Sequence, residues 1–258
     1  MWPVSEPTRP SDMVGKALAL LTQLGEYPQG VVASELARRC GFPLSTAHRL
    51  LGALVRDGFA AFDKSTKRYT LGLRVFQLAQ RVSHAQGFTG LARPILEQVS
   101  AATKEATLLA VLDGDQQLYV YSIGGPQQVS VVGEPGRHGP LHCTSQGKVL
   151  IAFAPEDVRE RLLATLDLSP HGPNTITNRA RFREEIARVT KVGYAIADEE
   201  HEAGIRAISV PVYDRQQIAV AALSTAAPAY RMTVAELVEH LPTLAQAARS
   251  LAAVMPLG

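Results

Sequence analysis

Cysteine is scarce in this chain of 258 residues, and the two that occur, Cys40 and Cys143, lie far apart. Such a pair offers no disulfide framework, so we expect a protein of the reducing cytoplasm. Long apolar runs are missing too: residues 149–154 and 218–223 fall far below the ~20 residues that cross a bilayer. No charged-then-apolar leader opens the sequence, so we expect neither a secretory signal nor contact with a membrane.

The motifs of common catalytic sites are also missing. The sequence has no G-x-S-x-G, no P-loop, no G-x-G-x-x-G and no H-E-x-x-H. Cys143 beside His142 could be a nucleophile and its base, but adjacent side chains seldom point toward each other. His138, His142 and Cys143 together suggest a metal site, because histidines at i and i+4 precede a thiol. However, Gly139-Pro140 prevents one helix from presenting both histidines, and no second cluster completes a tetrahedral set. We expect no catalysis, no cofactor and no metal.

Charge is nearly balanced, with a formal net charge of +2, but it is unevenly distributed. Residues 1–86 hold 11 Lys and Arg against 6 Asp and Glu, whereas the remainder holds 15 against 18. Because the N-terminal part is basic and the remainder is mildly acidic, we expect only the N-terminal part to bind a polyanion.

Three short helical patterns follow a proline-containing tail, residues 1–12, which we expect to be disordered. Apolar residues recur at helical spacing over residues 14–21, 33–40 and 44–54. Gly41 can supply the left-handed cap that ends the second pattern, and a connection of about three residues leads into the third. The spacing predicts a helix-turn-helix.

The outer face of the third pattern carries polar groups. Four residues lie at offsets of four, seven and eleven, hence along one line: Ser45, Arg49, Gly52 and Arg56, with Thr46 and His48 beside them. Hydroxyl, imidazole and guanidinium groups next to a glycine suit the major groove of DNA. A solvated face of a core helix would fit this pattern equally well when it is taken alone.

Two short strands are predicted over residues 58–62 and 67–71, joined by residues 63–66. A hairpin after a recognition helix is a wing, and basic residues at its tip suit phosphate or minor-groove contacts. Together these elements predict a winged helix-turn-helix over residues 13–72 that binds a double-stranded DNA operator. The predicted DNA contacts are Arg38, Ser45, Thr46, His48, Arg49, Lys64, Lys67 and Arg68.

A connecting helix is predicted over residues 73–87, with an apolar face that could pack against its twin in a dimer or on its own domain. Residues 88–258 predict a mixed α+β domain rather than repeating βαβ units. Its strands are predicted over residues 107–112, 117–123, 128–133, 204–213 and 218–226. Its helices are predicted over residues 91–104, 144–153, 155–166, 178–192 and 233–254.

Eight short segments form a characteristic set along the chain: 34–39 (SELARR), 45–51 (STAHRLL), 68–72 (RYTLG), 141–148 (LHCTSQGK), 193–194 (GY), 198–200 (DEE) with Gly204, 211–214 (PVYD) and 221–224 (AALS). By the order and spacing of these segments, the chain over about residues 13–255 resembles the IclR family of bacterial transcription regulators. The resemblance implies an α+β chain with a winged helix-turn-helix and a GAF-like sensor domain, assembled as homodimers or tetramers. It also implies control of genes of small-molecule metabolism by an organic acid or aromatic effector. Repression and activation both fit this resemblance, and we expect repression.

Two departures from the family pattern matter. Val32 stands where the family usually has Ser or Thr as a helix cap, a loss that costs roughly 1 kcal/mol of stability. Ala197, Ala207 and Ala226 stand where some relatives carry Asp, Cys and Ser in the effector pocket. The pocket is therefore expected to be more apolar, which favours a larger or aromatic ligand.

Effector contacts are expected where the chain turns into the helix starting near Thr144, because a helix N-terminus suits a carboxylate or phenolate. Each expected contact has an alternative interpretation. Thr144 and Ser145 could only cap the helix, and the hydroxyls of Ser209 and Ser224 could be hydrogen-bonded to backbone groups. The acidic residues 198–200 could form a solvated surface. The predicted effector contacts are His142, Thr144, Ser145, Asp198, Ala207, Ser209 and Ser224. The alternative function is an enzyme with an N-terminal protein-interaction module, which the missing catalytic motifs disfavour.

Overall fold

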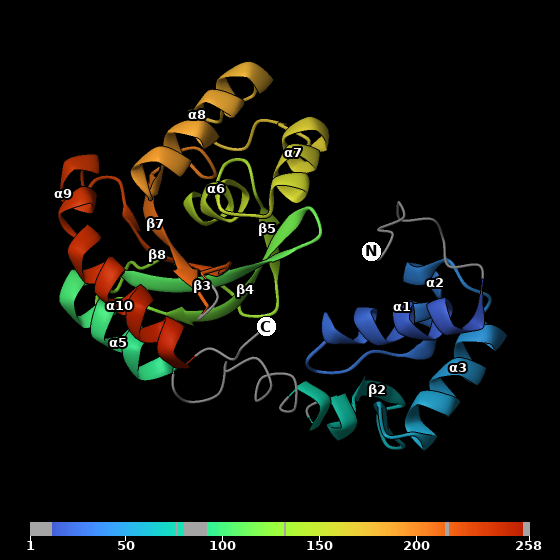
Figure 1. The fold of residues 1–258 in the computed structure, drawn as a ribbon. Coiled ribbons are helices and arrows are strands. Elements are labelled where there is room, and N and C mark those ends of the chain that lie inside the picture. Colours follow the sequence, from blue (N-terminus) through green and yellow to red (C-terminus); the bar gives the residue numbers. More distant parts are fainter. Residues whose placement is uncertain (1–11, 76, 80–91, 132, 215–216, 255–258) are drawn as a thin grey trace. The chain divides into compact units, whose positions relative to one another are not determined.

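The structure, a computed structural model, describes residues 12–75, 77–79, 92–131, 133–214 and 217–254. The chain divides into two compact units, Met1–His84 and Ala85–Gly258, and each is described by itself (Figure 1). The predicted disordered tail lies outside the described residues except for Asp12. The predicted connecting helix is described only at residues 73–75 and 77–79, which are helical.

Residues 12–72, the described part of the N-terminal unit ahead of the connecting segment, form three helices and a hairpin. The elements are α1 (Met13–Gly25), α2 (Ala33–Cys40), α3 (Leu44–Arg56), β1 (Ala60–Asp63) and β2 (Arg68–Leu71). Each helix contributes a fully buried leucine to the hydrophobic core of this unit: Leu20 from α1, Leu36 from α2 and Leu51 from α3. The strands pair antiparallel, and Tyr69 of β2 also bridges to Val31 ahead of α2. This is the predicted winged helix-turn-helix.

The ends of α2 follow the sequence signals. Gly41 adopts a left-handed conformation, with φ of 68°, and caps the C-terminus as predicted. Val32 occupies the N-cap and makes no side-chain cap hydrogen bond. Asp12, by contrast, caps α1, because its carboxylate accepts from the Gly15 N–H at 2.7 Å.

The described part of the C-terminal unit contains one six-stranded antiparallel sheet in the order β5-β4-β3-β8-β7-β6. The strands are β3 (Ala106–Asp113), β4 (Gln116–Ile123), β5 (His138–Pro140), β6 (Ala195–Asp198), β7 (Ile205–Tyr213) and β8 (Ala219–Pro228). The helices are α5 (Ala92–Thr103), α6 (Ser145–Ala152), α7 (Glu156–Thr165), α8 (Arg179–Val192), α9 (Val234–Glu239) and α10 (Leu241–Val254). This arrangement confirms the mixed α+β class.

Helices cover both faces of this sheet (Figure 1). On one face α5 and α10 pack over alternate residues of β7, Ile208, Val210 and Val212, because alternate side chains of a strand share a face. On the other face α6 and α8 pack over Ala110 and Ala222. The sheet therefore holds the start of α6 against the strands β3, β7 and β8.

The predicted strand over residues 128–133 is wrong for the residues that the structure describes. The Ser130 hydroxyl accepts from the Gly125 N–H at 3.0 Å, which closes a local loop instead of a strand ladder. The edge of β4 pairs instead with β5, where Gln117 lies opposite Gly139.

Two further elements differ from the prediction. The four-residue strand β6 pairs with β7 but is too short for an alternating pattern to reveal it. The predicted helix over residues 233–254 is divided into α9 and α10, with His240 as the C-cap of α9. Pro242 is the second residue of α10, and proline suits only the first turn of a new helix, because it lacks an N–H. Among the described residues, no helix combines the length and the apolar character that a membrane span requires.

Candidate functional site

The polar face of α3 points away from the core of the N-terminal unit. Ala47, Leu50 and Leu51 are buried on the opposite face. The exposed positions are Ser45, His48, Arg49, Gly52 and Arg56, with Thr46 half-buried. A Cβ atom added at Gly52 would meet no other atom within 4 Å, so the backbone there is open to close approach. The line of residues drawn from helical spacing is therefore present on the surface.

Arg49 is held only weakly within the chain. Its Nη2 donates to the Met13 sulfur at 3.2 Å, and a thioether is a weak acceptor. Arg38 is held more firmly, because its Nε and Nη2 donate to both oxygens of Glu35, which also accepts from Arg39. These hydrogen bonds lower the pKa of Glu35. Arg49 can therefore bind a partner at a lower free-energy cost than Arg38, because it breaks weaker intramolecular hydrogen bonds.

The hairpin turn is held in shape by Asp63. Its carboxylate accepts from the Ser65 N–H and hydroxyl and from the Thr66 hydroxyl, at 2.6 to 2.8 Å. These bonds lower the pKa of Asp63 to about 2. Lys64 and Lys67 are exposed on the same turn, where Lys67 has φ of 57°.

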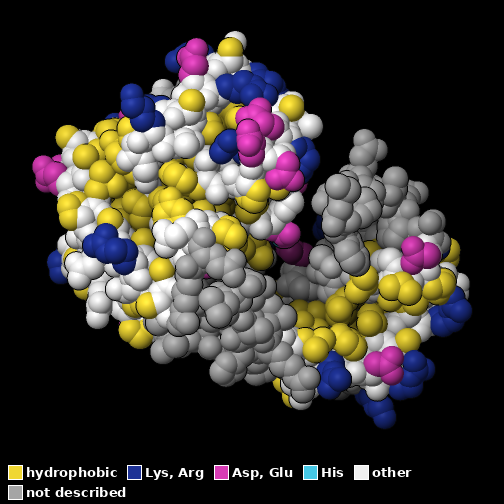
Figure 2. Space-filling view, in the orientation of Figure 1, with side chains coloured by type: hydrophobic (Ala, Val, Ile, Leu, Met, Phe, Trp, Pro, Cys, Tyr) yellow, Lys and Arg dark blue, Asp and Glu magenta, His cyan; other side chains and the backbone are white. Residues whose placement is uncertain are grey.

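Arg68 differs from the two lysines because it also joins the hairpin to the helices. Its Nη1 donates to the carbonyl of Gly30, ahead of α2, at 2.6 Å. In Figure 2, Lys and Arg side chains gather over the region of α3 and the hairpin. The surface formed by the exposed face of α3 and this turn is polar and cationic.

The C-terminal unit has a small pocket between the start of α6 and the sheet, with a cavity volume of about 70 Å³. It is lined by Leu108, Tyr119, Val131, Thr144, Ser145, Gln146, Ala197, His201, Ile205, Ala207, Ser224 and Ala226. Four of the predicted effector residues are in this lining: Thr144, Ser145, Ala207 and Ser224. The three alanines expected to make the pocket apolar also line it.

Thr144 both lines the pocket and caps α6. Its hydroxyl accepts from the Gly147 N–H at 3.1 Å and donates to the Pro140 carbonyl at 2.8 Å. A Cβ atom at Gly147 would lie only 2.2 Å from the Leu141 carbonyl oxygen, so only glycine lets the preceding turn fold over α6. The two interpretations of Thr144, cap and pocket wall, are therefore compatible.

The structure places the other three predicted effector residues outside the pocket lining. The Ser209 hydroxyl is buried and donates to the Leu223 carbonyl at 2.9 Å. Asp198 pairs with Arg206 at 2.5 Å. His142 is buried, with Nε2 at 2.9 Å from the Ser169 carbonyl oxygen, and burial lowers its pKa.

Sequence reasoning missed six lining residues: Leu108, Tyr119, Val131, Gln146, His201 and Ile205. Gln146 lies inside the LHCTSQGK segment and could have been found there. The others come from segments distant in sequence, which only the folded sheet brings together.

A buried lysine on α6 is hydrogen-bonded to a residue next to the pocket lining. Lys148 on α6 is fully buried and donates to Glu200 at 2.6 Å, to Glu185 at 3.2 Å and to the Ile196 carbonyl at 3.0 Å. Burial raises the pKa of Glu200. Because Glu200 precedes His201, this network fixes the chain where it enters the pocket wall.

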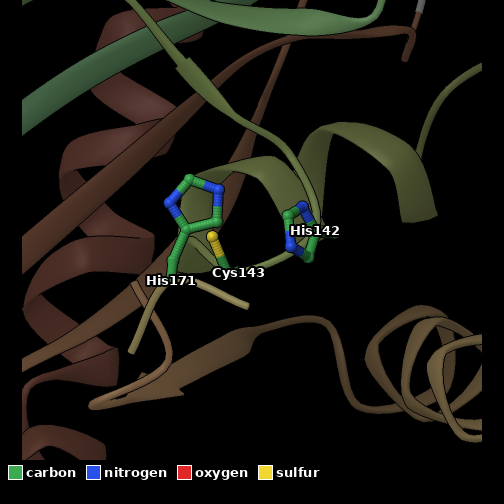
Figure 3. Close-up of side chains that lie close together, drawn as sticks. All are labelled: His142, Cys143 and His171. Atoms are coloured by element: carbon green, nitrogen blue, oxygen red, sulfur yellow. The ribbon is translucent and has the colours of Figure 1, made fainter. Parts of the chain in front are cut away.

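The structure also brings together three side chains that can bind a metal. His171, in the segment between α7 and α8, lies beside His142 and Cys143, and their ligand atoms are all within 4.8 Å of one another (Figure 3). Burial raises the pKa of Cys143 to about 12. No pattern in the sequence indicates that His171 belongs to this cluster.

Comparison with known proteins agrees with both halves of the chain. Residues 13–64 match the IclR helix-turn-helix domain, and residues 80–253 match the bacterial transcriptional regulator IclR C-terminal domain. The chain is 30% identical over 240 residues to the HTH-type transcriptional regulator KdgR of Escherichia coli strain K12, covering 93% of this chain and 91% of KdgR. It is 27% identical to the acetate operon repressor of Salmonella typhimurium, covering 84% and 80% of the two chains.

Solved structures share the fold. The crystal structure of an IclR homolog from Microbacterium hydrocarbonoxydans complexed with 4-hydroxybenzoate matches with a TM-score of 0.80 and 30% identity, over 92% of this chain and 98% of that one.

A winged helix-turn-helix with a polar recognition face, in one chain with a domain that holds a small-molecule pocket, defines a ligand-responsive DNA-binding regulator and not an enzyme. The chain belongs to the IclR family of bacterial transcriptional regulators.

Proposed function

We propose that this protein is a cytoplasmic repressor that binds its operator as a homodimer or tetramer and responds to a small organic acid or aromatic effector. The observation that carries the proposal is the open polar face of α3 beside the cationic hairpin turn. We infer repression, as opposed to activation, by analogy with the acetate operon repressor. Its name states its role, and this chain resembles it over most of its length.

In this proposal α3 enters the major groove. Arg49 and His48 reach base edges, while Ser45 and Thr46, near the start of the helix, contact the backbone or bases. Lys64 and Lys67 contact phosphates. Arg38 and Arg68 also contact phosphates, through the guanidinium N–H groups that are not used in their intramolecular hydrogen bonds.

The effector binds in the pocket at the start of α6. Apolar walls from Leu108, Val131 and the alanines receive an apolar body, while Thr144, Ser145 and the helix N-terminus receive a carboxylate. A relative in complex with 4-hydroxybenzoate supports this ligand class. A cavity of about 70 Å³ is below the ~300 Å³ at which ligand pockets usually begin, so the ligand is small or the walls move apart on binding.

Selection of binding sites from a random pool of DNA duplexes tests the DNA-binding role. A dimer with two α3 helices is expected to enrich an inverted repeat whose half-sites lie roughly one helical turn, or a multiple of it, apart. Recovery of sequences without a repeated motif would contradict dimeric operator binding.

A thermal-shift screen of small acids and aromatics tests the effector role. A ligand at ~100 times its Kd stabilises the folded protein by about 2.7 kcal/mol. We expect Ala207→Leu, which fills the pocket, to abolish the shift, and Ala101→Leu, at an exposed position of α5, to keep it. A hit whose shift survives Ala207→Leu binds elsewhere and would contradict this placement of the effector.

A further inference from the structure

Three side chains from separate parts of the C-terminal unit meet at one point. His142 and Cys143 lie between β5 and α6, and His171 lies 28 residues further on, in the segment between α7 and α8. Figure 3 shows the Cys143 side chain beside the His171 ring, with the His142 ring on its other side. Within the part of the chain that the structure describes, no other group of three such side chains converges this closely.

The hydrogen bonding of His142 prepares one ring nitrogen for a metal. Nε2 lies 2.9 Å from the Ser169 carbonyl oxygen. A carbonyl oxygen can only accept, so Nε2 carries the proton and Nδ1 keeps a free lone pair. A backbone carbonyl that orients a histidine in this way is one of the common outer partners of a metal ligand.

A solvent-accessible route leads to the cluster. His142 and His171 form part of the wall of an open groove with a cavity volume of about 300 Å³, on which Asp167 also lies. The carboxylate of Asp167 favours the approach of a cation, and the exposure of His171 lets its side chain adjust. The groove has a lining different from that of the effector pocket.

We propose that His142, Cys143 and His171 bind a transition-metal cation of the Zn²⁺ kind. Two imidazole nitrogens and one thiolate are ligands that Zn²⁺ prefers, and three protein ligands leave a fourth tetrahedral position for water. Zn–N and Zn–S bonds of 2.0–2.3 Å place ligand atoms about 3.5 Å apart. Separations of up to 4.8 Å therefore need closures of up to about 1.3 Å, to which the exposed His171 side chain contributes. Binding releases the thiol proton of Cys143 to solvent.

The site is joined to the wall of the effector pocket through His201. The rings of His171 and His201 stack with centroids 5.5 Å apart, and His201 lines the pocket. The segment after His171 is hydrogen-bonded to the chain before His201, because Gly172 N and the Thr175 hydroxyl both donate to the Glu200 carbonyl. A metal that fixes His171 therefore fixes His201. This proposal differs from the sequence-based expectation of no metal, which did not include His171.

Co²⁺ substitution tests the site directly. Full-length reduced protein, freed of metals by a chelator, is titrated with Co²⁺ and then with Zn²⁺ against a chromophoric chelator. We expect one equivalent to bind, with a thiolate-to-Co²⁺ charge-transfer band and the intense visible bands of four-coordinate Co²⁺. Cys143→Ser is expected to remove the charge-transfer band. His171→Ala is expected to weaken Zn²⁺ binding by more than about 100-fold, beyond the 10–100-fold that loss of an outer partner costs.

Matched variants separate this site from others in the chain. Cys40→Ser removes the other cysteine, and His138→Gln removes an exposed histidine that pairs with Asp113 at 2.7 Å. Both are expected to bind Co²⁺ as the wild type does. Because His171 is exposed, His171→Ala is expected to keep the wild-type circular dichroism. The proposal is overturned if no stoichiometric binding occurs, or if the thiolate band survives Cys143→Ser.

The link to the pocket has its own readout. Addition of Zn²⁺ is expected to shift the NMR signals of the His201 ring in the wild type and not in His171→Ala. If Zn²⁺ binds with the expected spectrum but leaves the His201 signals unchanged, the coupling is wrong although the metal site stands. Neither measurement depends on the identity of the effector or on DNA binding.

Discussion

The position of Lys148 shows how a single buried charge shapes this protein. Its ammonium group has no exposure and lies between Glu200 and Glu185. One oxygen of Glu200, Oε2, is buried without a hydrogen-bond partner among the described residues, so this carboxylate depends on Lys148. The pair places residues 199–201 against α6 and thereby positions one wall of the pocket.

We expect Lys148→Met to destabilise the fold by about 3–5 kcal/mol, because it leaves a buried carboxylate without its counter-charge. Adding Glu200→Gln removes that charge and is expected to restore part of the loss. The midpoint of urea unfolding measures both. A double variant no more stable than Lys148→Met would show that the lysine does not act through Glu200.

The same variant has a predictable pH dependence. Burial raises the pKa of Glu200, and loss of Lys148 raises it further. A carboxyl group whose pKa is raised by folding favours the folded state below its unfolded pKa, and this contribution is lost as the pH rises through the folded pKa. The deficit of Lys148→Met is therefore expected to be larger at pH 8 than at pH 5. An equal deficit at both would contradict this explanation.

At the scale of elements, helical spacing and turn chemistry predicted the N-terminal unit well. Gly41 ended α2, and the polar line on α3 was visible in the sequence because a helix repeats regularly. The sheet was harder to predict, since β5 and β6 owe their existence to neighbouring strands and not to a pattern of their own. The part of the pocket lining that was predicted comes from the LHCTSQGK segment, the three alanines and Ser224, whereas Ser209 lies outside the lining. Tyr119 and His201 reach it through tertiary packing.

Helix α2 offers a test of capping in the DNA-binding unit. Val32→Ser is expected to stabilise the first turn by about 1 kcal/mol, because a serine at the N-cap can accept from the N–H of Glu35. Slower hydrogen exchange of the Ser34 and Glu35 amides measures the effect. Val32→Ala, which has no acceptor, is the control and is expected to leave exchange unchanged or faster. Equal protection in both variants would show that a serine does not cap this helix.

At the scale of the whole molecule, the two units divide the work of an IclR-family regulator. The N-terminal unit presents the cationic surface of α3 and the hairpin turn, and the C-terminal unit encloses the pocket and the histidine cluster. The uneven charge of the sequence agrees with this division, because the excess of Lys and Arg falls in the unit that contains α3.

The affinity for a selected operator and for random duplex, measured at two salt concentrations, tests the central claim that α3 reads DNA beside the hairpin turn. Arg49→Ala is expected to weaken operator binding by about 1–3 kcal/mol and random binding much less. The double variant Lys64→Ala, Lys67→Ala is expected to weaken both alike and to lower the salt slope by about 2, because each phosphate contact contributes roughly 0.9. Arg183→Ala, on α8 of the other unit, serves as the charge-matched control and is expected to change neither. If Arg49→Ala binds operator and random DNA as the wild type does, α3 is not the recognition helix.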